Sequence, residues 1–156
     1  MKKEGKNSLL IVDDDTGNLM ELVDILQSEY NIYTAKDGTS ALSRAEKFMP
    51  DLILLDIIMP GMSGYEVLGE LQKSDNTMDI PVIFITGLGL AEEEQKGFSL
   101  GAVDYIVKPF NSVVVKHRIY SQMKIINLQH DLDVMRETYG TYQGAGNDKS
   151  GLSSMY

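Results

Sequence analysis

Five short apolar runs, separated by stretches with helical spacing, constrain the fold of this chain more than any other feature. The runs are Leu9–Val12, Ile32–Thr34, Leu52–Leu55, Pro81–Ile85 and Val103–Val107. Continuous apolar segments of this length are typical of strands buried on both faces of a parallel sheet. Strand–helix alternation favours parallel strands joined by right-handed crossovers, with helices on both faces. The sequence therefore predicts an α/β fold with a doubly wound, five-stranded parallel sheet.

Polar residues follow four of these five runs at the point where each predicted strand ends. They are Asp13-Asp14-Asp15, Asp56, Thr86 and Lys108. The carboxyl ends of parallel strands lie at one edge of a sheet, and sites form there near the point where the strand order reverses. The second run lacks such a residue and is expected at the sheet margin. The sequence thus predicts one polar site at this edge.

The residue types at this edge favour a metal-assisted phosphoryl site. Two carboxylates ~4 Å apart repel by about 4 kcal/mol at an effective dielectric constant of about 20, and a divalent cation relieves that repulsion. Oxygen ligands without His or Cys suit Mg²⁺. Lys108 adds a positive charge and Thr86 a hydroxyl donor, both suited to phosphoryl oxygens. A carboxylate such as Asp56 can itself be the nucleophile.

Four motifs lie at these strand ends. They are Val12-Asp13-Asp14, Leu55-Asp56-Ile57-Ile58-Met59-Pro60-Gly61, Ile85-Thr86-Gly87 and Tyr105-Ile106-Val107-Lys108-Pro109-Phe110. Together they resemble the response-regulator receiver domain of two-component signalling. The resemblance covers roughly residues 8–120 and implies a flavodoxin-like (βα)5 fold. A helical extension is expected to follow at 121–139, and a Gly/Ser-rich linker or tail at 140–156.

The resemblance also implies a role for each residue of the site. Asp56 would be the phosphoacceptor and, with Asp14 and the backbone carbonyl of Ile58, would bind Mg²⁺ or Mn²⁺ directly. Asp13 would act through a water molecule, and Asp15 would not be a metal ligand. Lys108 would pair with Asp56 and precede a cis peptide bond to Pro109. Thr86 and Tyr105 would form the switch. In the family, the residues at the positions of Ile58 and Leu88 influence the access of water to the phosphate. Both are apolar here, which predicts slow loss of the phosphate.

The resemblance implies partners as well. The phosphodonor would be a sensor histidine kinase, a phosphotransfer protein or a small molecule such as acetyl phosphate. The face made by the fourth helix, fifth strand and fifth helix would bind a partner or form a homodimer. In the extension, apolar residues recur at spacings of three and four: Ile125, Leu128, Leu132, Met135 and Tyr139. This a/d pattern fits either a dimerising stalk or packing on the body of the chain itself.

Composition excludes several other classes of protein. The 14 basic and 23 acidic residues give a net charge of −9, which argues against direct nucleic acid binding. The absence of Cys excludes a disulfide scaffold, a zinc finger and a thiol nucleophile. We find no apolar run of membrane length and expect a cytoplasmic protein.

The acidic residues at this edge of the sheet also allow other interpretations. A magnesium-dependent phosphatase of the haloacid-dehalogenase type would need a second Asp two residues after the nucleophile, where this chain has Ile58. A flavodoxin-like cofactor binder would set its phosphate against the acidic site. The three Asp residues after the first run could also simply cap the first helix. We therefore expect a non-enzymatic receiver, either alone or excised from a multidomain regulator with an enzymatic output.

Overall fold

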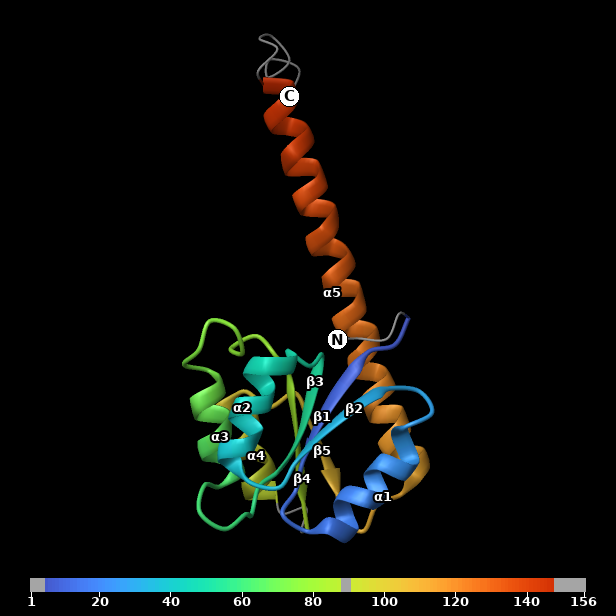
Figure 1. Cartoon of the computed structure of the whole chain (residues 1–156), viewed down its shortest axis with the longest axis vertical. Coiled ribbons are helices and arrows are strands. Elements are labelled where there is room, and N and C mark those ends of the chain that lie inside the picture. Colours follow the sequence, from blue (N-terminus) through green and yellow to red (C-terminus); the bar gives the residue numbers. More distant parts are fainter. Residues whose placement is uncertain (1–4, 88–90, 148–156) are drawn as a thin grey trace. The chain divides into compact units, whose positions relative to one another are not determined.

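The computed structural model describes residues 5–87 and 91–147, which form five strands and five helices in strict alternation (Figure 1). The elements are β1 (Ser8–Val12), α1 (Thr16–Leu26), β2 (Asn31–Ala35), α2 (Gly38–Phe48), β3 (Leu52–Asp56), α3 (Gly64–Leu71), β4 (Val82–Thr86), α4 (Ala91–Leu100), β5 (Asp104–Val107) and α5 (Ser112–Asn147). All strand pairs are parallel, in the order β2-β1-β3-β4-β5. The predicted doubly wound α/β fold is confirmed, with β2 at the margin.

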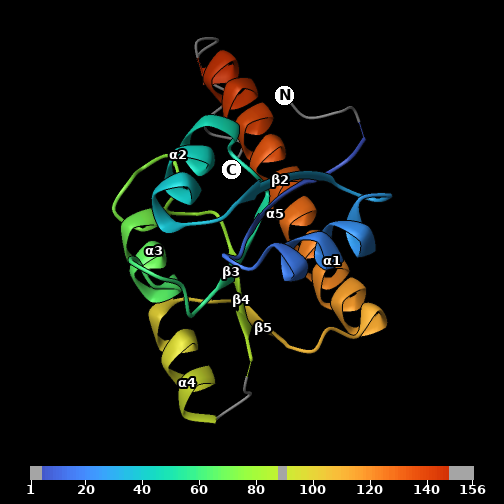
Figure 2. The ribbon, with the colours of Figure 1, turned by 60° about the horizontal axis from the view of Figure 1, so that its bottom comes forward.

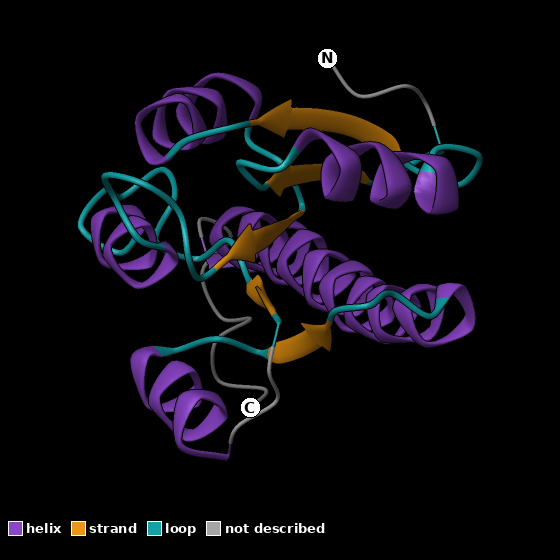
Figure 3. Ribbon diagram, turned by 90° about the horizontal axis from the view of Figure 1, so that it is seen from below, coloured by secondary structure: helices purple, strands orange, loops and turns teal. Residues whose placement is uncertain are grey.

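Helices cover both faces of the sheet. Helices α2, α3 and α4 lie on one face, and α1 and residues 112–120 of α5 lie on the other (Figures 2 and 3). Alternate strand residues such as Leu10 and Ile53 pack with Ala41 of α2 and Val67 of α3 in one buried cluster. Their strand neighbours are equally buried and point to the opposite face. Burial on both faces explains why β1, β3 and β4 are continuous apolar runs.

Local sequence signals set several helix ends. The Ser63 hydroxyl accepts a hydrogen bond from the Glu66 N–H at 3.2 Å, and the Glu66 carboxylate accepts one from the Ser63 N–H, which makes a capping box at the start of α3. Gly101 ends α4 with a φ of +112°, a conformation that favours glycine. Both features follow from the sequence pattern alone.

The chain divides into two units after Tyr120, and α5 runs through the boundary. The helix continues past Gly140 to Asn147, through residues whose composition predicts a linker. A glycine inside a helix costs about 1 kcal/mol relative to alanine, but no proline follows Pro109 to interrupt the hydrogen-bond ladder. The rest of the predicted tail, 148–156, lies outside the described residues. None of the helices in the described ranges combines the length and apolarity needed to cross a membrane.

Candidate functional site

The carboxyl ends of β1, β3, β4 and β5 bring the predicted site residues to one edge of the sheet. Val12 and Leu55 are in register on neighbouring strands, so Asp13 and Asp56 follow side by side. The strand order reverses between β1 and β3, which is where sites form in open parallel sheets. The Lys108 N–H donates a hydrogen bond of 2.8 Å to the Thr86 carbonyl, which holds the end of β5 beside that of β4.

Three carboxylates meet at this edge. One oxygen each from Asp13, Asp14 and Asp56 lies within 4.8 Å of the others, and Asp13 and Asp56 are buried while Asp14 is exposed. Asp13 Oδ1 accepts a hydrogen bond from the Asp15 N–H at 2.9 Å. Asp13 Oδ2 is buried and accepts no hydrogen bond from any described residue. An all-oxygen donor set with a buried oxygen lacking a hydrogen bond fits a hard divalent cation such as Mg²⁺.

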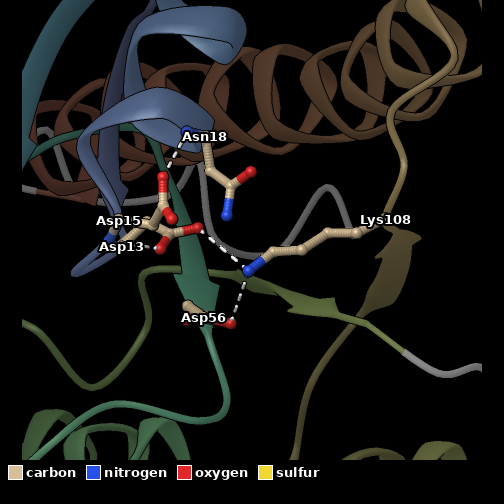
Figure 4. Close-up of polar contacts among 5 residues, drawn as sticks. All are labelled: Asp13, Asp15, Asn18, Asp56 and Lys108. Carbon is tan, nitrogen blue, oxygen red and sulfur yellow. Dashed lines mark hydrogen bonds and ion pairs between the residues drawn. The ribbon is translucent and has the colours of Figure 1, made fainter.

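Lys108 supplies the positive charge of the site (Figure 4). Its ammonium lies 3.4 Å from Asp56 Oδ1, to which it donates a hydrogen bond, and 3.3 Å from Asp13 Oδ2 as an ion pair without hydrogen-bond geometry. Figure 4 shows the side chain reaching from the end of β5 to a position between the two carboxylates. The Lys108–Pro109 peptide bond that follows is cis, as the resemblance implied.

The surroundings of Asp56 favour its protonated form. Burial and the neighbouring Asp13 carboxylate raise the pKa of Asp56 to about 6, although Lys108 acts in the opposite direction. Burial alone would lower the pKa of Lys108, but the carboxylates of Asp56 and Asp13 outweigh it and raise that pKa. The single ammonium therefore does not compensate the acidic cluster fully, and a bound cation would complete the neutralisation.

Asp15 takes a different position from the other acidic residues. It is exposed, and its Oδ1 accepts a hydrogen bond from the Asn18 N–H at 3.0 Å at the start of α1 (Figure 4). The helix-capping interpretation of the acidic triplet thus applies to Asp15. Asp13 instead holds the Asp15 backbone in place, because its Oδ1 accepts the Asp15 N–H.

Ile58 and Leu88 are the two positions predicted to control water access to the phosphate, and the structure describes only the first of them. The Ile58 side chain is 75% exposed, so an apolar group lies at the surface two residues after Asp56. The Ile58 carbonyl as a metal ligand stays a prediction. Leu88 lies outside the described residues.

Gly64 shapes the backbone after β3, a feature that the sequence analysis missed. Its N–H donates a hydrogen bond of 2.8 Å to the Ile57 carbonyl. A Cβ at this position would overlap the Asp56 carbonyl oxygen and the Ile57 Cα. Only glycine therefore lets the start of α3 close against the backbone that carries Asp56. The one sequence signal is a glycine directly after the capping residue Ser63.

Gly97 on α4 plays a similar part for Tyr105. The Tyr105 ring is buried between Phe84 and Phe98, with ring centroids 5.9 and 5.0 Å away. A Cβ on the buried Gly97 would overlap the Tyr105 hydroxyl and crowd Phe84. Gly97 therefore makes room for the inward position of Tyr105. Thr86, its predicted partner in the switch, is buried at the end of β4. No sequence signal marked Gly97.

Fold and site geometry agree with the comparisons to known proteins. The profile of the response regulator receiver domain matches residues 9–120. This chain therefore belongs to the response regulator receiver family. Among solved structures, the chemotaxis protein CheY4 of Vibrio cholerae matches with a TM-score of 0.71 and 30% sequence identity, over 75% of this chain and 98% of that one.

Curated relatives are longer than this chain. A probable cyclic di-GMP phosphodiesterase of Vibrio cholerae is 43% identical over 117 residues, which is 75% of this chain and 26% of the relative. The response regulator PleD of Caulobacter vibrioides is 40% identical over 114 residues, 72% of this chain and 25% of PleD. The chain thus spans about a quarter of the length of these two relatives.

Proposed function

We propose that Asp56 accepts a phosphoryl group and that this modification is the signal the protein transmits. Receiver domains in general receive it from sensor histidine kinases or phosphotransfer proteins, and we assign such a donor to this chain. The observation that supports the proposal best is the Lys108 ammonium, 3.3 and 3.4 Å from two buried carboxylates at the strand-order reversal.

The acidic cluster would hold Mg²⁺ or Mn²⁺. Asp14, Asp56 and the Ile58 carbonyl would be direct ligands, and Asp13 would act through water. The bound ion would neutralise carboxylate charge and polarise the phosphoryl oxygens. A carboxylate with a pKa of about 6 binds a cation in competition with protons. Cation binding is therefore expected to weaken as the pH falls below about 6.

Each residue has one task in the transfer. An Asp56 carboxylate oxygen attacks phosphorus as the bond from phosphorus to the donor imidazole nitrogen, or to the acetate oxygen of acetyl phosphate, breaks. The leaving atom keeps the electron pair. Lys108, already paired with Asp56, moves to a phosphoryl oxygen and stabilises the charge there. The Thr86 hydroxyl turns to donate to another phosphoryl oxygen, and Tyr105, its partner in the switch, packs inward behind it beneath α4.

The output surface in this proposal is the face of α4, β5 and the start of α5. This face has exposed apolar side chains on each element, among them Phe98, Val107 and Val114. This face would bind a protein partner or a second copy of the chain. In this proposal the protein works in the cytoplasm, does not bind nucleic acid directly, and has no enzymatic activity beyond the chemistry of Asp56 itself. Because the two curated relatives are about four times longer and one of them is a probable phosphodiesterase, control of a linked enzymatic domain is a second candidate output. The length of the open reading frame that encodes the chain distinguishes these two outputs, because only the second requires a further domain in the same protein.

Intact mass spectrometry tests the proposed function. The protein is incubated with acetyl phosphate and Mg²⁺, and its mass is compared with that of the Asp56→Asn variant and with a sample in EDTA. We expect one base-labile phosphoryl group on the wild type with Mg²⁺ and none in either control. Steady turnover of a small phosphate ester would instead favour the phosphatase alternative, and an unmodified wild-type chain would contradict both.

A further inference from the structure

The helical extension has an exposed apolar stripe that the phosphoacceptor site does not use. Five residues of α5 form it, and their exposed fractions range from 39% at Leu132 to 65% at Met135. The members are Ile125, Leu128, Leu132, Met135 and Tyr139. Their spacings of three and four place them at alternating a and d positions of a heptad, on one side of the helix.

An exposed helix of this kind is not stable in water by itself. Nucleation of a helix is costly, and most helical stability in proteins comes from burial of an apolar face. From Ser121 to Asn147 the helix spans more than three heptads, because it continues through the residues whose composition predicted a linker. The stripe occupies about two of these heptads, from Ile125 to Tyr139, and offers the apolar seam of a short two-stranded coiled coil.

Charged residues beside the stripe specify which partner fits. With Ile125 at a and Leu128 at d, Asp131 falls at position g and Arg136 at the following e position. In a parallel pair of identical helices, a g residue faces the e residue of the next heptad on the partner. Asp131 would therefore face the Arg136 of a second copy, and symmetry repeats this pair on the other side of the seam.

The apolar residues agree with that choice. In the first heptad, a β-branched residue at a with Leu at d, as in Ile125 and Leu128, favours two parallel strands, whereas the second heptad has Leu132 at a and Met135 at d. Within one chain, Arg136 lies 3.8 Å from Asp133, on its outer side, with both side chains well exposed. A pair this long and exposed is weak and does not prevent Arg136 from turning to a partner.

We infer that residues 125–139 of α5 form a parallel two-stranded coiled coil with a second copy of this chain, in the register that sets Asp131 against Arg136 of the other copy. The seam does not include Asp56 or any other residue of the phosphoacceptor site, so we expect the dimer to form without phosphorylation. Because the two helices pair in parallel and in register, the dimer is symmetric and contains two equivalent phosphorylation sites, one in each copy.

Sedimentation equilibrium of the full chain without a phosphodonor tests the dimer. We expect a dimer for wild type and for Asp56→Asn. Leu132→Glu puts a charge in the seam and should weaken the dimer by more than about a hundredfold. Val134→Glu is the matched control, because Val134 is also apolar and exposed but lies at position c. A monomeric wild type at every concentration, or a dimer that Leu132→Glu leaves intact, would overturn the inference.

Charge reversal tests the register. Asp131→Arg and Arg136→Asp should each weaken the dimer by about tenfold, since each creates two like-charge contacts. The double variant should recover wild-type affinity, whereas Glu137→Arg at the outward f position should have little effect. Failure of the double variant to recover would exclude this register.

Introduced cysteines test the orientation, because the chain has no cysteine of its own. Leu128→Cys lies at a d position, which faces its own copy only in a parallel pair. We expect a rapid intermolecular disulfide from Leu128→Cys and a slow one, or none, from His130→Cys at position f. Equal rates for the two variants would contradict the parallel seam.

Discussion

The edge of the sheet in the receiver unit and the stripe on the helical extension depart from ordinary burial in opposite ways. At the sheet edge, Asp13 and Asp56 are charged groups that the fold buries. On the extension, apolar side chains such as Ile125 and Met135 remain exposed. A buried charge requires a counter-ion, and an exposed apolar stripe requires a partner surface. Each region therefore indicates the kind of partner that we propose for it.

The two regions also differ in what holds them in place. Asp56 is set by backbone pairing of β3 with its neighbours and by the close approach of α3 at Gly64. Residues 121–147 are held by the hydrogen-bond ladder of one helix. Added volume should therefore be costly where a helix packs on the backbone around the acidic site, whereas an exposed position of the extension outside its seam should tolerate it. Within the receiver unit, variants that add volume or remove the buried charge should change stability in the following order of size.

Gly64→Ala should have the largest effect on stability. The added Cβ would collide with the backbone of Asp56 and Ile57, which cannot move without disturbing β3. We expect a loss of about 3 kcal/mol in the free energy of unfolding, measured by urea denaturation, because overpacking against rigid backbone has no cheap relief.

Gly69→Ala is the matched control on the same helix. A Cβ at Gly69 meets nothing within 4 Å. The free energy of unfolding should rise by about 0.5–1 kcal/mol, because alanine is the better helix former. Equal effects of the two substitutions would show that the contact between α3 and Asp56 is not tight.

Asp56→Asn should stabilise the metal-free protein at neutral pH. The pKa of Asp56 is about 6 in the fold, against an ordinary value of 3.8, so the native state binds this proton more tightly than the unfolded chain does. Its contribution to stability is full below about pH 4 and is lost as the pH rises to about 6. Above that pH, the variant should exceed wild type by about 2–3 kcal/mol in urea denaturation with EDTA.

The pH series has an internal check and a matched control. The difference between Asp56→Asn and wild type should shrink towards acidic pH, where the wild-type carboxyl is protonated. Asp15→Asn is the matched control and should change the free energy of unfolding little, since Asp15 is exposed and asparagine caps a helix equally well. A difference for Asp56→Asn that stays constant between pH 4 and 8 would contradict the proposed electrostatics.

Gly97→Ala should have a smaller effect that depends on Tyr105. The new Cβ would displace the Tyr105 side chain from beneath α4, at a cost of about 1–2 kcal/mol. In a Tyr105→Ala background the same substitution should cost much less, because the principal clash is gone. A double-mutant cycle in urea measures this coupling. Additive effects would show that Gly97 does not make room for Tyr105.

The pattern along the chain predicted the fold and most of the site because both depend on local signals. An apolar run precedes each of the four residues Asp13, Asp56, Thr86 and Lys108. Parallel pairing then brings the carboxyl ends of the strands to one edge of the sheet, whichever side chains follow them. The Ser63–Glu66 capping box is equally local. That Lys108 pairs with Asp56 came only from the family resemblance, since no rule of spacing relates residues 52 positions apart. Its ion pair with Asp13 was not predicted.

The roles of two glycines could not be predicted, because they depend on which residues of other elements pack against them. Gly64 and Gly97 look like ordinary helix glycines until the tertiary structure brings Asp56 and Tyr105 against them. Composition was also a weak guide at Gly140, where the helix continues. Once a helix is nucleated, adding residues is far easier than starting it, so a few glycines need not end it.

We have proposed that the buried charge of this chain is a phosphoacceptor site centred on Asp56. Borohydride reduction after phosphorylation tests it most directly, because it converts an aspartyl phosphate into homoserine at the modified position. The protein is treated with acetyl phosphate and Mg²⁺, reduced, digested and sequenced by tandem mass spectrometry. We predict homoserine at position 56 alone and none when Mg²⁺ is omitted. Homoserine at position 13 or 14, or unmodified Asp56 in the presence of Mg²⁺, would rule out Asp56 as the phosphoacceptor.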